Sequence, residues 1–245
     1  MEKLKLRKKL NIIMIAESII ILIIVLFFFI FRFKNYILEN KNNSFNIPII
    51  YINLAHRVDR RKEFEKEMEY ISINKYYRVN AIYDKKKPIR GCALSHLYAI
   101  KMAKRLNFPC VLICEDDFVF NRNNLPSSIK EKISQSLKEC EDFDVLMLAC
   151  NIKQKNHDQP IKNHVQRIKF AYSACAYIVR NGYYDDLINV YNDAINKLEP
   201  IDYTWKKLQE KDKWYCCKPM LGHQRFSYSD IEHKNVYYRF GRLYI

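Results

Sequence analysis

The sequence predicts an α/β domain with a mainly parallel central sheet, preceded by one N-terminal transmembrane helix. Short continuous apolar runs alternate with segments whose apolar residues recur at helical spacing. This alternation is typical of parallel strands that are covered by helices on both faces. A chain of 245 residues with 49% apolar residues can bury such a core. Fibrous, collagen-like and fully disordered proteins are thereby excluded.

Residues 10–31 form the predicted transmembrane anchor, because all but three of their side chains are apolar. As a helix they would extend about 33 Å, close to the ~30 Å of a bilayer core. Five of the nine residues 1–9 are basic, which predicts a cytosolic N-terminal tail. A cleaved signal peptide is the alternative, but no small-residue cleavage site follows the span. Residues 32–46 are polar and Asn-rich, as in a stem, and residues 47–245 would then fold on the luminal or extracytoplasmic side.

The folded part begins with a predicted strand at residues 49–52. A helix follows in which Phe64, Met68 and Ile71 recur at i, i+4 and i+7, the apolar stripe of a surface helix. The same alternation predicts the remaining elements: a helix from near Cys92, strands at residues 111–113, 145–148 and 174–179, and a helix that Asn181 caps and Pro200 ends. Residues 151–169 are predicted to form an exposed loop.

Composition narrows the classes of function. With only four glycines, the sequence contains neither GxGxxG nor GxxxxGK[ST], which argues against the dinucleotide and P-loop nucleotide sites that use those motifs. The net charge is +15 and suits an anionic ligand. None of the eight cysteines forms a CxxC pair, which disfavours a zinc-ribbon or thioredoxin-like site. They are predicted to be small buried side chains, or to form one or two disulfides in a luminal domain.

Three consecutive carboxylates, Glu115, Asp116 and Asp117, follow a predicted buried strand. Open α/β sheets bind ligands at the carboxyl ends of their strands, and hard oxygen ligands suit Mg²⁺ or Mn²⁺ beside a diphosphate. On an extended backbone, Glu115 and Asp117 would point to one side and Asp116 to the other. The alternative is an acidic turn exposed to water.

Basic residues lie where the first helix should begin, at Arg57, Arg60 and Arg61. Cations in a first turn oppose the helix dipole, whereas a bound phosphate would be stabilised by the arginines and by the free N–H groups. This pattern predicts an anion site, with a solvated basic turn as the alternative.

Gly91, Ser95 and His96 lie at the start of the second predicted helix. These residues could touch a nucleotide or orient the acidic segment. Alternatively, Ser95 caps the helix and His96 is a hydrogen-bonded core residue. A Ser/His pair without an acidic third member or a nucleophile elbow does not predict a hydrolase.

Taken in order, several of these segments resemble glycosyltransferase family 25, which includes lipooligosaccharide and procollagen galactosyltransferases. The residues that carry the resemblance are Ile52-Asn53-Leu54 with Arg57, Asp59 and Arg60, then Arg78-Val79-Asn80-Ala81, Gly91-Cys92 with Ser95-His96, Glu115-Asp116-Asp117, Phe143-Asp144-Val145-Leu146, the strand at 174–178, Asp202, and the tail from Gln224 to Ser229-Asp230-Ile231.

The resemblance implies a GT-A fold for residues 47–245, a UDP-sugar donor and inversion at the sugar carbon. It also implies a divalent metal, Mn²⁺ or Mg²⁺, held by Glu115 and Asp117. The donor would be bound by Asn53, Arg57, Arg60, Ala81, Gly91, Ser95, His96 and Asp116.

The expected reaction moves a hexose, galactose or glucose, to a hydroxyl group of a glycan or protein. A carboxylate that ligates a cation is a poor proton acceptor, so the catalytic base must be another one. Asp202 is the first candidate, Asp144 and Asp230 are the others, and a simple helix cap is the alternative role for Asp202.

Two other classes compete with this enzyme. One is a catalytically inactive glycosyltransferase-like binding or adhesion module. The other is a nucleic-acid binder or metal-dependent nuclease. The basic residues are scattered and no aromatic stacking platform is evident, so no nucleic-acid partner is expected.

Overall fold

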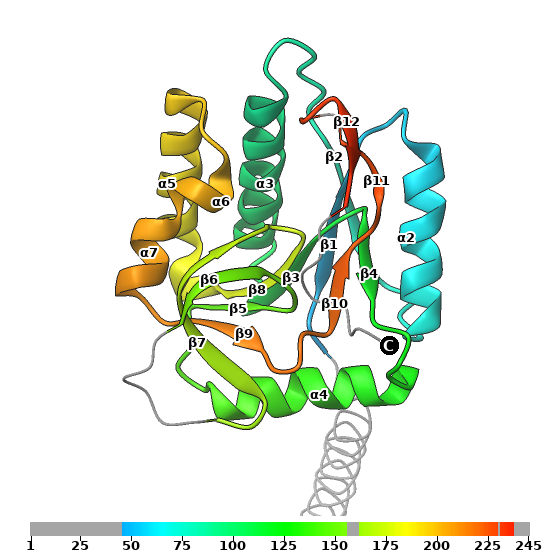
Figure 1. Ribbon diagram of the computed structural model, residues 1–245, viewed down its shortest axis with the longest axis vertical. Helices are drawn as coiled ribbons and strands as arrows, with labels where there is room; N and C mark the ends of the chain where they lie inside the picture. The colour runs from blue at the N-terminus through cyan, green and yellow to red at the C-terminus, as the bar shows by residue number, and fades with distance from the viewer. Residues whose placement is uncertain (1–45, 156–161, 230, 238–245) are drawn as a thin grey trace, which may run out of the picture. The chain divides into compact units, whose positions relative to one another are not determined.

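The computed structural model describes residues 46–155, 162–229 and 231–237, which fold around an eight-stranded sheet (Figure 1). The predicted anchor, the cytosolic tail and the stem up to residue 45 lie outside the described residues. No helix in the described segments combines the length and apolarity that crossing a membrane requires.

Helices and strands alternate through the first half of this part of the chain. The helices are α2 (Val58–Tyr70), α3 (Pro88–Arg105), α4 (Pro126–Glu139), η1 (Asn181–Tyr183), α5 (Tyr184–Lys197), α6 (Ile201–Thr204) and α7 (Lys206–Lys211). The strands are β1 (Ile49–Asn53), β2 (Tyr77–Asn80), β3 (Cys110–Glu115), β4 (Phe118–Phe120), β5 (Val145–Met147), β6 (Asn151–Lys155), β7 (Val165–Tyr172), β8 (Ala176–Arg180), β9 (Trp214–Cys217), β10 (Gly222–Gln224), β11 (Ser227–Ser229) and β12 (Lys234–Val236).

The large sheet is mixed, so the prediction of a mainly parallel sheet is wrong. Its strand order is β2-β1-β3-β8-β5-β9-β7-β6. The pairs β1–β2, β1–β3 and β5–β9 are parallel, whereas β3–β8, β5–β8, β6–β7 and β7–β9 are antiparallel. A strand buried on both faces has a continuous apolar sequence whichever way it runs, so the apolar runs did not encode direction.

Two other expectations about the elements need correction. The expected exposed loop at residues 151–169 contains strands β6 and most of β7, which pair as a hairpin. Helix α3 begins at Pro88, four residues before Cys92. A proline suits that first position, because it lacks the N–H that would have no partner there.

The parallel part of the sheet brings the ends of three strands to one edge. In the register of these strands, Asn53 lies beside Asn80 and Ile52 beside Glu115. The carboxyl ends of β1, β2 and β3 therefore meet at the edge where the predicted site residues lie.

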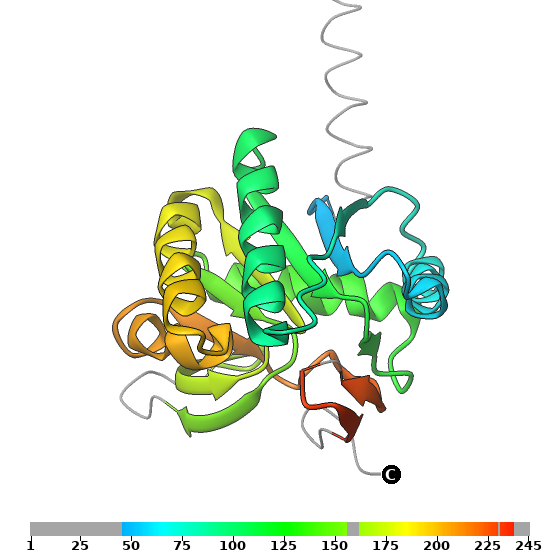
Figure 2. The ribbon, with the colours of Figure 1, turned by 90° about the horizontal axis from the view of Figure 1, so that it is seen from above.

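Each face of the sheet packs on different helices. Ile50, Ile52 and Ile113 belong to the main core with residues of α3 and α5, and these two helices lie side by side (Figures 1 and 2). The side chain of Tyr51 points to the other face and stacks on Phe64 of α2, with ring centroids 4.2 Å apart. Both faces are thus covered, as predicted.

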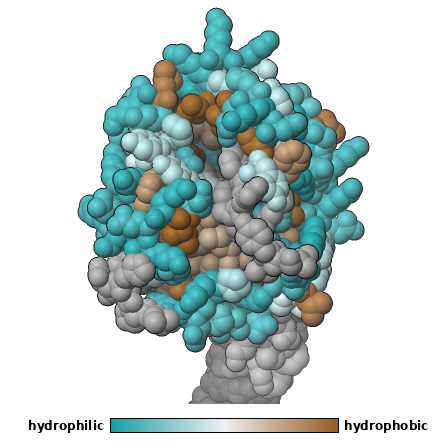
Figure 3. Space-filling view, viewed as in Figure 1, coloured by the Kyte–Doolittle hydropathy of each residue, from teal (hydrophilic) through white to brown (hydrophobic). Residues whose placement is uncertain are grey.

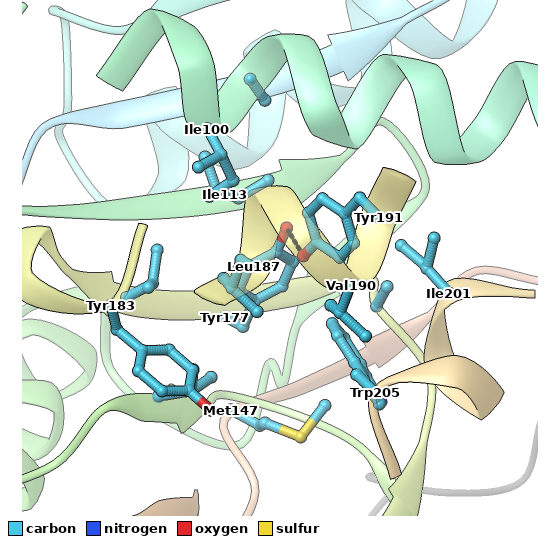
Figure 4. Packing of buried hydrophobic residues seen from close by; sticks show 14 of the residues in the cluster. Ile100, Ile113, Met147, Tyr177, Tyr183, Leu187, Val190, Tyr191, Ile201 and Trp205 are labelled. Atoms are coloured by element: carbon cyan, nitrogen blue, oxygen red, sulfur yellow. Dashed lines mark hydrogen bonds between the residues drawn. The ribbon is translucent and has the colours of Figure 1, made fainter. Parts of the chain in front are cut away.

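The main core is rich in aromatic side chains. Around Leu187 of α5, Figure 4 shows Tyr177, Tyr191 and Trp205, all fully buried. Burying one such large side chain contributes about 1.5–3 kcal/mol to stability. None of the eight cysteines, all within described segments, forms a disulfide.

The C-terminal segment returns to the strand ends. Strand β10 pairs antiparallel with β4, which directly follows the acidic residues, and β11 pairs with β12. Gly222 permits the first pairing, because a Cβ there would collide with the ring of Phe118 and the carbonyl of Val119.

Candidate functional site

Asn53 connects the end of β1 to the acidic residues. Its Nδ2 donates to Asp116 Oδ2 at 2.7 Å and to the carbonyl of Arg57 at 3.1 Å. Its Oδ1 accepts from Arg78 Nε at 3.0 Å. Asn53 is buried and is not among the residues that line the cavity beside the three carboxylates. It therefore positions Asp116 from the interior of the protein.

The three carboxylates, Glu115, Asp116 and Asp117, lie at a turn rather than along a continuing strand, and we call this segment the acidic turn. Glu115 ends β3, and Asp116 and Asp117 form the turn into β4. All three line the same cavity; the division between two sides was expected only for an extended backbone, which ends at Glu115. A turn changes the direction of the backbone, and side-chain alternation applies only while the strand continues.

Arg60 holds this turn from the first turn of α2. One nitrogen, Nη1, lies 3.1 Å from Asp116 Oδ1 and 3.4 Å from Asp117 Oδ2. The other, Nη2, donates to Ser227 Oγ at 2.6 Å and to the carbonyl of Tyr228 at 2.8 Å. The predicted anion-binding arginine is therefore engaged by two carboxylates and by the C-terminal segment.

Burial, followed by the charge of Glu115, raises the pKa of Asp117. Within the described structure, Asp117 Oδ1 is buried and has no hydrogen-bond partner. Gln224 Nε2 lies 3.1 Å from Asp117 Oδ2 and 3.4 Å from Glu115 Oε2. One amide group thus lies within hydrogen-bond distance of both carboxylates, and an unpartnered buried oxygen suits a cation ligand.

The cavity beside this turn has a volume of about 440 Å³. Away from the carboxylates, its walls include Arg57, Tyr83 and Lys85. The face drawn in Figure 3 is mostly hydrophilic, and hydrophobic residues gather around its central hollow. We call the 440 Å³ cavity that Glu115, Asp116 and Asp117 line the first cavity.

A loop at residues 81–85 forms one wall of the first cavity, and α3 holds it. Ser95 Oγ accepts from the Ile82 N–H at 2.8 Å and donates to the Gly91 carbonyl at 2.7 Å. A Cβ on Gly91 would lie 2.5 Å from the carbonyl oxygen of Ile82. Ser95 and Ala81 line the cavity, whereas Gly91 lies behind it and permits the close approach of the loop.

His96 connects the acidic residues to the core. Its Nε2 lies 3.2 Å from Glu115 Oε1, and its Nδ1 lies 3.0 Å from the hydroxyl of Tyr177. That hydroxyl lies 2.8 Å from the hydroxyl of Tyr191, the contact dashed in Figure 4. His96 is fully buried, so both expected roles coincide: it is a packed core histidine and it orients an acidic side chain.

A second cavity, of about 640 Å³, contains Asp202. Asp202 Oδ2 accepts from the Ser173 N–H at 2.9 Å, and burial raises the pKa of the carboxyl group. Five residues line both cavities: Cys92, Glu115, Gln224, Ser229 and Ile231. The two cavities therefore adjoin, with Glu115 between the acidic turn and Asp202.

The model of glycosyltransferase family 25, described as an LPS biosynthesis protein family, matches residues 87–205. The predicted resemblance to this family is confirmed. The matched region contains Gly91, Ser95, His96, the acidic turn and Asp202. The residues of the C-terminal segment that line the two cavities, from Gln224 to Val236, all lie beyond it.

A relative in Acanthamoeba polyphaga mimivirus, whose name assigns it to the glycosyltransferases, is 30% identical over 125 residues. The match covers 42% of this chain and 37% of the relative, so the chain spans little more than a third of that protein's length.

Two solved structures show a distant overall likeness. One is a glycosyltransferase involved in glycosylation of the major capsid of PBCV-1, with 12% identity and a TM-score of 0.47 over 69% of this chain and 80% of the other. The other is apo UDP-glucose pyrophosphorylase, with 12% identity and a TM-score of 0.42 over 78% of each chain.

Among the residues that the family resemblance implied, Asp144 is placed apart from the others. It precedes β5, where its carboxylate accepts from the Lys213 N–H at 2.8 Å, and its carbonyl accepts from the Arg180 N–H. Arg180 pairs with Cys110 at the start of β3, so Asp144 lies at the sheet edge opposite Glu115. Asp230 lies outside the described residues.

Sequence reasoning gave no role to three residues that complete the site. Arg78 holds Asn53, Gln224 bridges Glu115 and Asp117, and Tyr177 contacts His96. Arg78 and Gln224 lay within segments that resemble family 25, which was the available signal. Tyr177 lay in an apolar strand, where nothing in the sequence marked its hydroxyl.

Proposed function

We propose that this chain transfers a hexose, galactose or glucose, from a UDP-sugar to a hydroxyl group of a glycan or protein, with inversion at the sugar carbon. The observation that carries the proposal is the pair of adjoining cavities. The acidic turn faces the first cavity, Asp202 faces the second, and Glu115 lines both. A donor and an acceptor can thus meet beside Glu115.

Glu115 and Asp117 are the residues that would hold Mn²⁺ or Mg²⁺. Both carboxylates contact the Gln224 amide group, and the buried, unpartnered Asp117 Oδ1 favours a cation. When bound, such a cation supplies positive charge to the diphosphate as the sugar leaves. Arg60 and Asn53 keep Asp116 and Asp117 in place, and Arg57 lines the cavity where an anionic donor would lie.

Asp202 is the proposed base. As the acceptor oxygen forms its bond to the sugar carbon, Asp202 takes the proton of that hydroxyl group. The bond from the sugar carbon to UDP breaks on the opposite side, and its electron pair remains on the diphosphate oxygen. The hydrogen bond from Ser173 N–H fixes one carboxylate oxygen, and the raised pKa makes Asp202 a better proton acceptor than an exposed aspartate.

The membrane anchor at residues 10–31 and the luminal or extracytoplasmic domain belong to the same proposal. They are supported by the apolar span and its basic N-terminal flank. In sealed vesicles that carry the full chain, the domain should resist added protease until detergent is present. Complete digestion without detergent would contradict this orientation.

Turnover of nucleotide sugars tests the activity. The full chain in detergent is mixed with Mn²⁺ and separate UDP-sugars, and UDP release is measured with and without simple glycan acceptors. We expect release with UDP-galactose or UDP-glucose that stops when the metal is chelated. The Asp117→Asn variant serves as the inactive control. Absence of turnover with every donor, although UDP binds, would favour a binding module instead.

A further inference from the structure

Cys92, His96 and Glu115 form a cluster of potential metal ligands between the two cavities. Cys92 and His96 are one turn apart on α3, and Glu115 ends the neighbouring strand β3. The thiol sulfur, an imidazole nitrogen and a carboxylate oxygen all lie within 4.8 Å of one another. Two of these ligands are softer than the carboxylates of the acidic turn, so this cluster suits a different class of cation.

The surroundings of His96 are those of a metal-binding histidine. A ring nitrogen that binds a metal must be unprotonated, and the other nitrogen then carries the proton and donates it. Here Nδ1 lies 3.0 Å from the Tyr177 hydroxyl, which can accept that hydrogen bond and donate its own proton to the Tyr191 hydroxyl 2.8 Å away. The two tyrosines thus allow His96 to present the lone pair of Nε2 toward Glu115, once a cation replaces the hydrogen bond between Nε2 and Glu115 Oε1.

The local charge also favours a cation. The carboxylates of Glu115, Asp117 and Asp202 line the same pair of cavities as Cys92. The same negative charges attract a divalent cation, and a bound cation in turn stabilises the thiolate. Binding would release the thiol proton to solvent.

We propose that Cys92, His96 and Glu115 bind Zn²⁺ or a cation of similar softness, in competition with the hard-cation site that Glu115 shares with Asp117. Three protein ligands would leave one position for water or another ligand, and Cys92 and Glu115 both line the two cavities. The occupied site engages Glu115 and blocks the junction of the cavities, so Zn²⁺ inhibits sugar transfer. Only this last consequence rests on the proposed function.

Co²⁺ is the probe for the site, because a cobalt–thiolate bond gives a charge-transfer absorption band and a tetrahedral site gives intense visible bands. Co²⁺ is titrated into the full chain without any nucleotide sugar, and Zn²⁺ is then added. We expect the charge-transfer band to appear and Zn²⁺ to remove it. The band should be absent in Cys92→Ser and in Cys92→Ala. It should remain in Cys110→Ser, the matched control at the opposite end of β3.

Tyr177→Phe keeps the ring and removes only the hydroxyl. It should weaken Zn²⁺ affinity by about tenfold or more if the hydroxyl supports His96 as a ligand. Circular dichroism of each variant reports whether the fold is kept. A missing charge-transfer band in the natural sequence, or a band that persists in both Cys92 variants, would overturn the site.

Inhibition is measured separately, as the fraction of Mn²⁺-supported turnover that Zn²⁺ removes. We expect half-inhibition to require at least ~10-fold more Zn²⁺ in Cys92→Ser than in the natural sequence. Equal inhibition would overturn the inhibitory role while the cobalt spectrum still decides the site. If no turnover exists at all, the cobalt spectrum remains a complete test.

Discussion

Arg60 contacts four groups: two carboxylates of the acidic turn, one hydroxyl and one backbone carbonyl of the C-terminal segment. Its side chain is only 13% exposed. Arg60→Ala would leave Asp116 and Asp117 without their cation, so we expect it to lower the free energy of unfolding by about 2–4 kcal/mol. Urea unfolding monitored by tryptophan fluorescence measures this change.

Arg57→Ala is the matched control. The Arg57 side chain is nearly as buried as that of Arg60, at 18% exposed, but its partner Asp59 is 63% exposed. A pair that water reaches through one member contributes at most about 1 kcal/mol. If the two variants lost equal stability, Arg60 would have no special part in holding the turn.

Some of the residues at the site were predictable from the sequence and others were not. The strand–carboxylate pattern predicted the place of Glu115, Asp116 and Asp117 at a strand end, and the family resemblance implied Asp202. The partners of Arg60 were not predictable, because Ser227 and Tyr228 come from a segment about 167 residues away along the chain. The charge of Arg60 predicted a nearby anion, and in the fold the anions are the carboxylates of Asp116 and Asp117.

Close contact between α3 and the loop at residues 81–85 makes Gly91 sensitive to substitution. Alanine is the better helix former, but its Cβ would lie 2.5 Å from the Ile82 carbonyl oxygen. We expect Gly91→Ala to lower the melting temperature, with a net cost of about 1–2 kcal/mol after the gain in helix propensity. It should also weaken UDP binding, because the loop lines the first cavity.

Gly182→Ala is the control for Gly91→Ala, since a Cβ at Gly182 has nothing within 4 Å. Its melting temperature should match that of the natural sequence. A Gly91→Ala protein with unchanged stability and UDP affinity would show that the loop is not held by this contact.

Glu67 of α2 connects that helix to β4 through a buried carboxylate, which accepts from the Phe120 N–H at 3.1 Å. Burial raises its pKa despite the hydrogen bond and the nearby arginines. The folded protein then holds this proton to a higher pH than the unfolded chain does. The contribution of Glu67 to stability is therefore lost as the pH rises from about 4.3, the ordinary pKa of glutamate, through its raised pKa in the folded protein.

Glu67→Gln removes that titration. We subtract the free energy of unfolding of the natural sequence from that of the variant. This difference should increase with pH across this window, whatever its value at the lowest pH. Urea unfolding at a series of pH values measures the slope. A difference that stays constant with pH would contradict the raised pKa.

The alternation of strands and helices was predictable because burial leaves a periodic pattern in each segment. Strand direction was not, because β5 and residues 176–179 of β8 are continuous buried runs that would look alike in either orientation. The hairpin of β6 and β7 was read as a loop, since the exposed residues of β6 hide the period-2 signal.

All eight cysteines are free thiols in this fold, and six of them are buried. We therefore expect eight thiols to react in denatured, unreduced protein, and the melting temperature to be the same with and without reductant. Fewer reactive thiols together with a reductant-sensitive melting temperature would reveal a disulfide that this fold does not contain.

We expect the first cavity to bind metal and UDP and the second to supply the base for sugar transfer, and one paired measurement tests this division. Metal-dependent UDP binding by calorimetry and sugar transfer by UDP release are compared for Asp117→Asn and Asp202→Asn. Asp117→Asn should lose the metal dependence of UDP binding. Asp202→Asn should bind metal and UDP like the natural sequence and transfer sugar at least ~10²-fold more slowly. A normal transfer rate in Asp202→Asn, or an unchanged metal dependence in Asp117→Asn, would contradict the account.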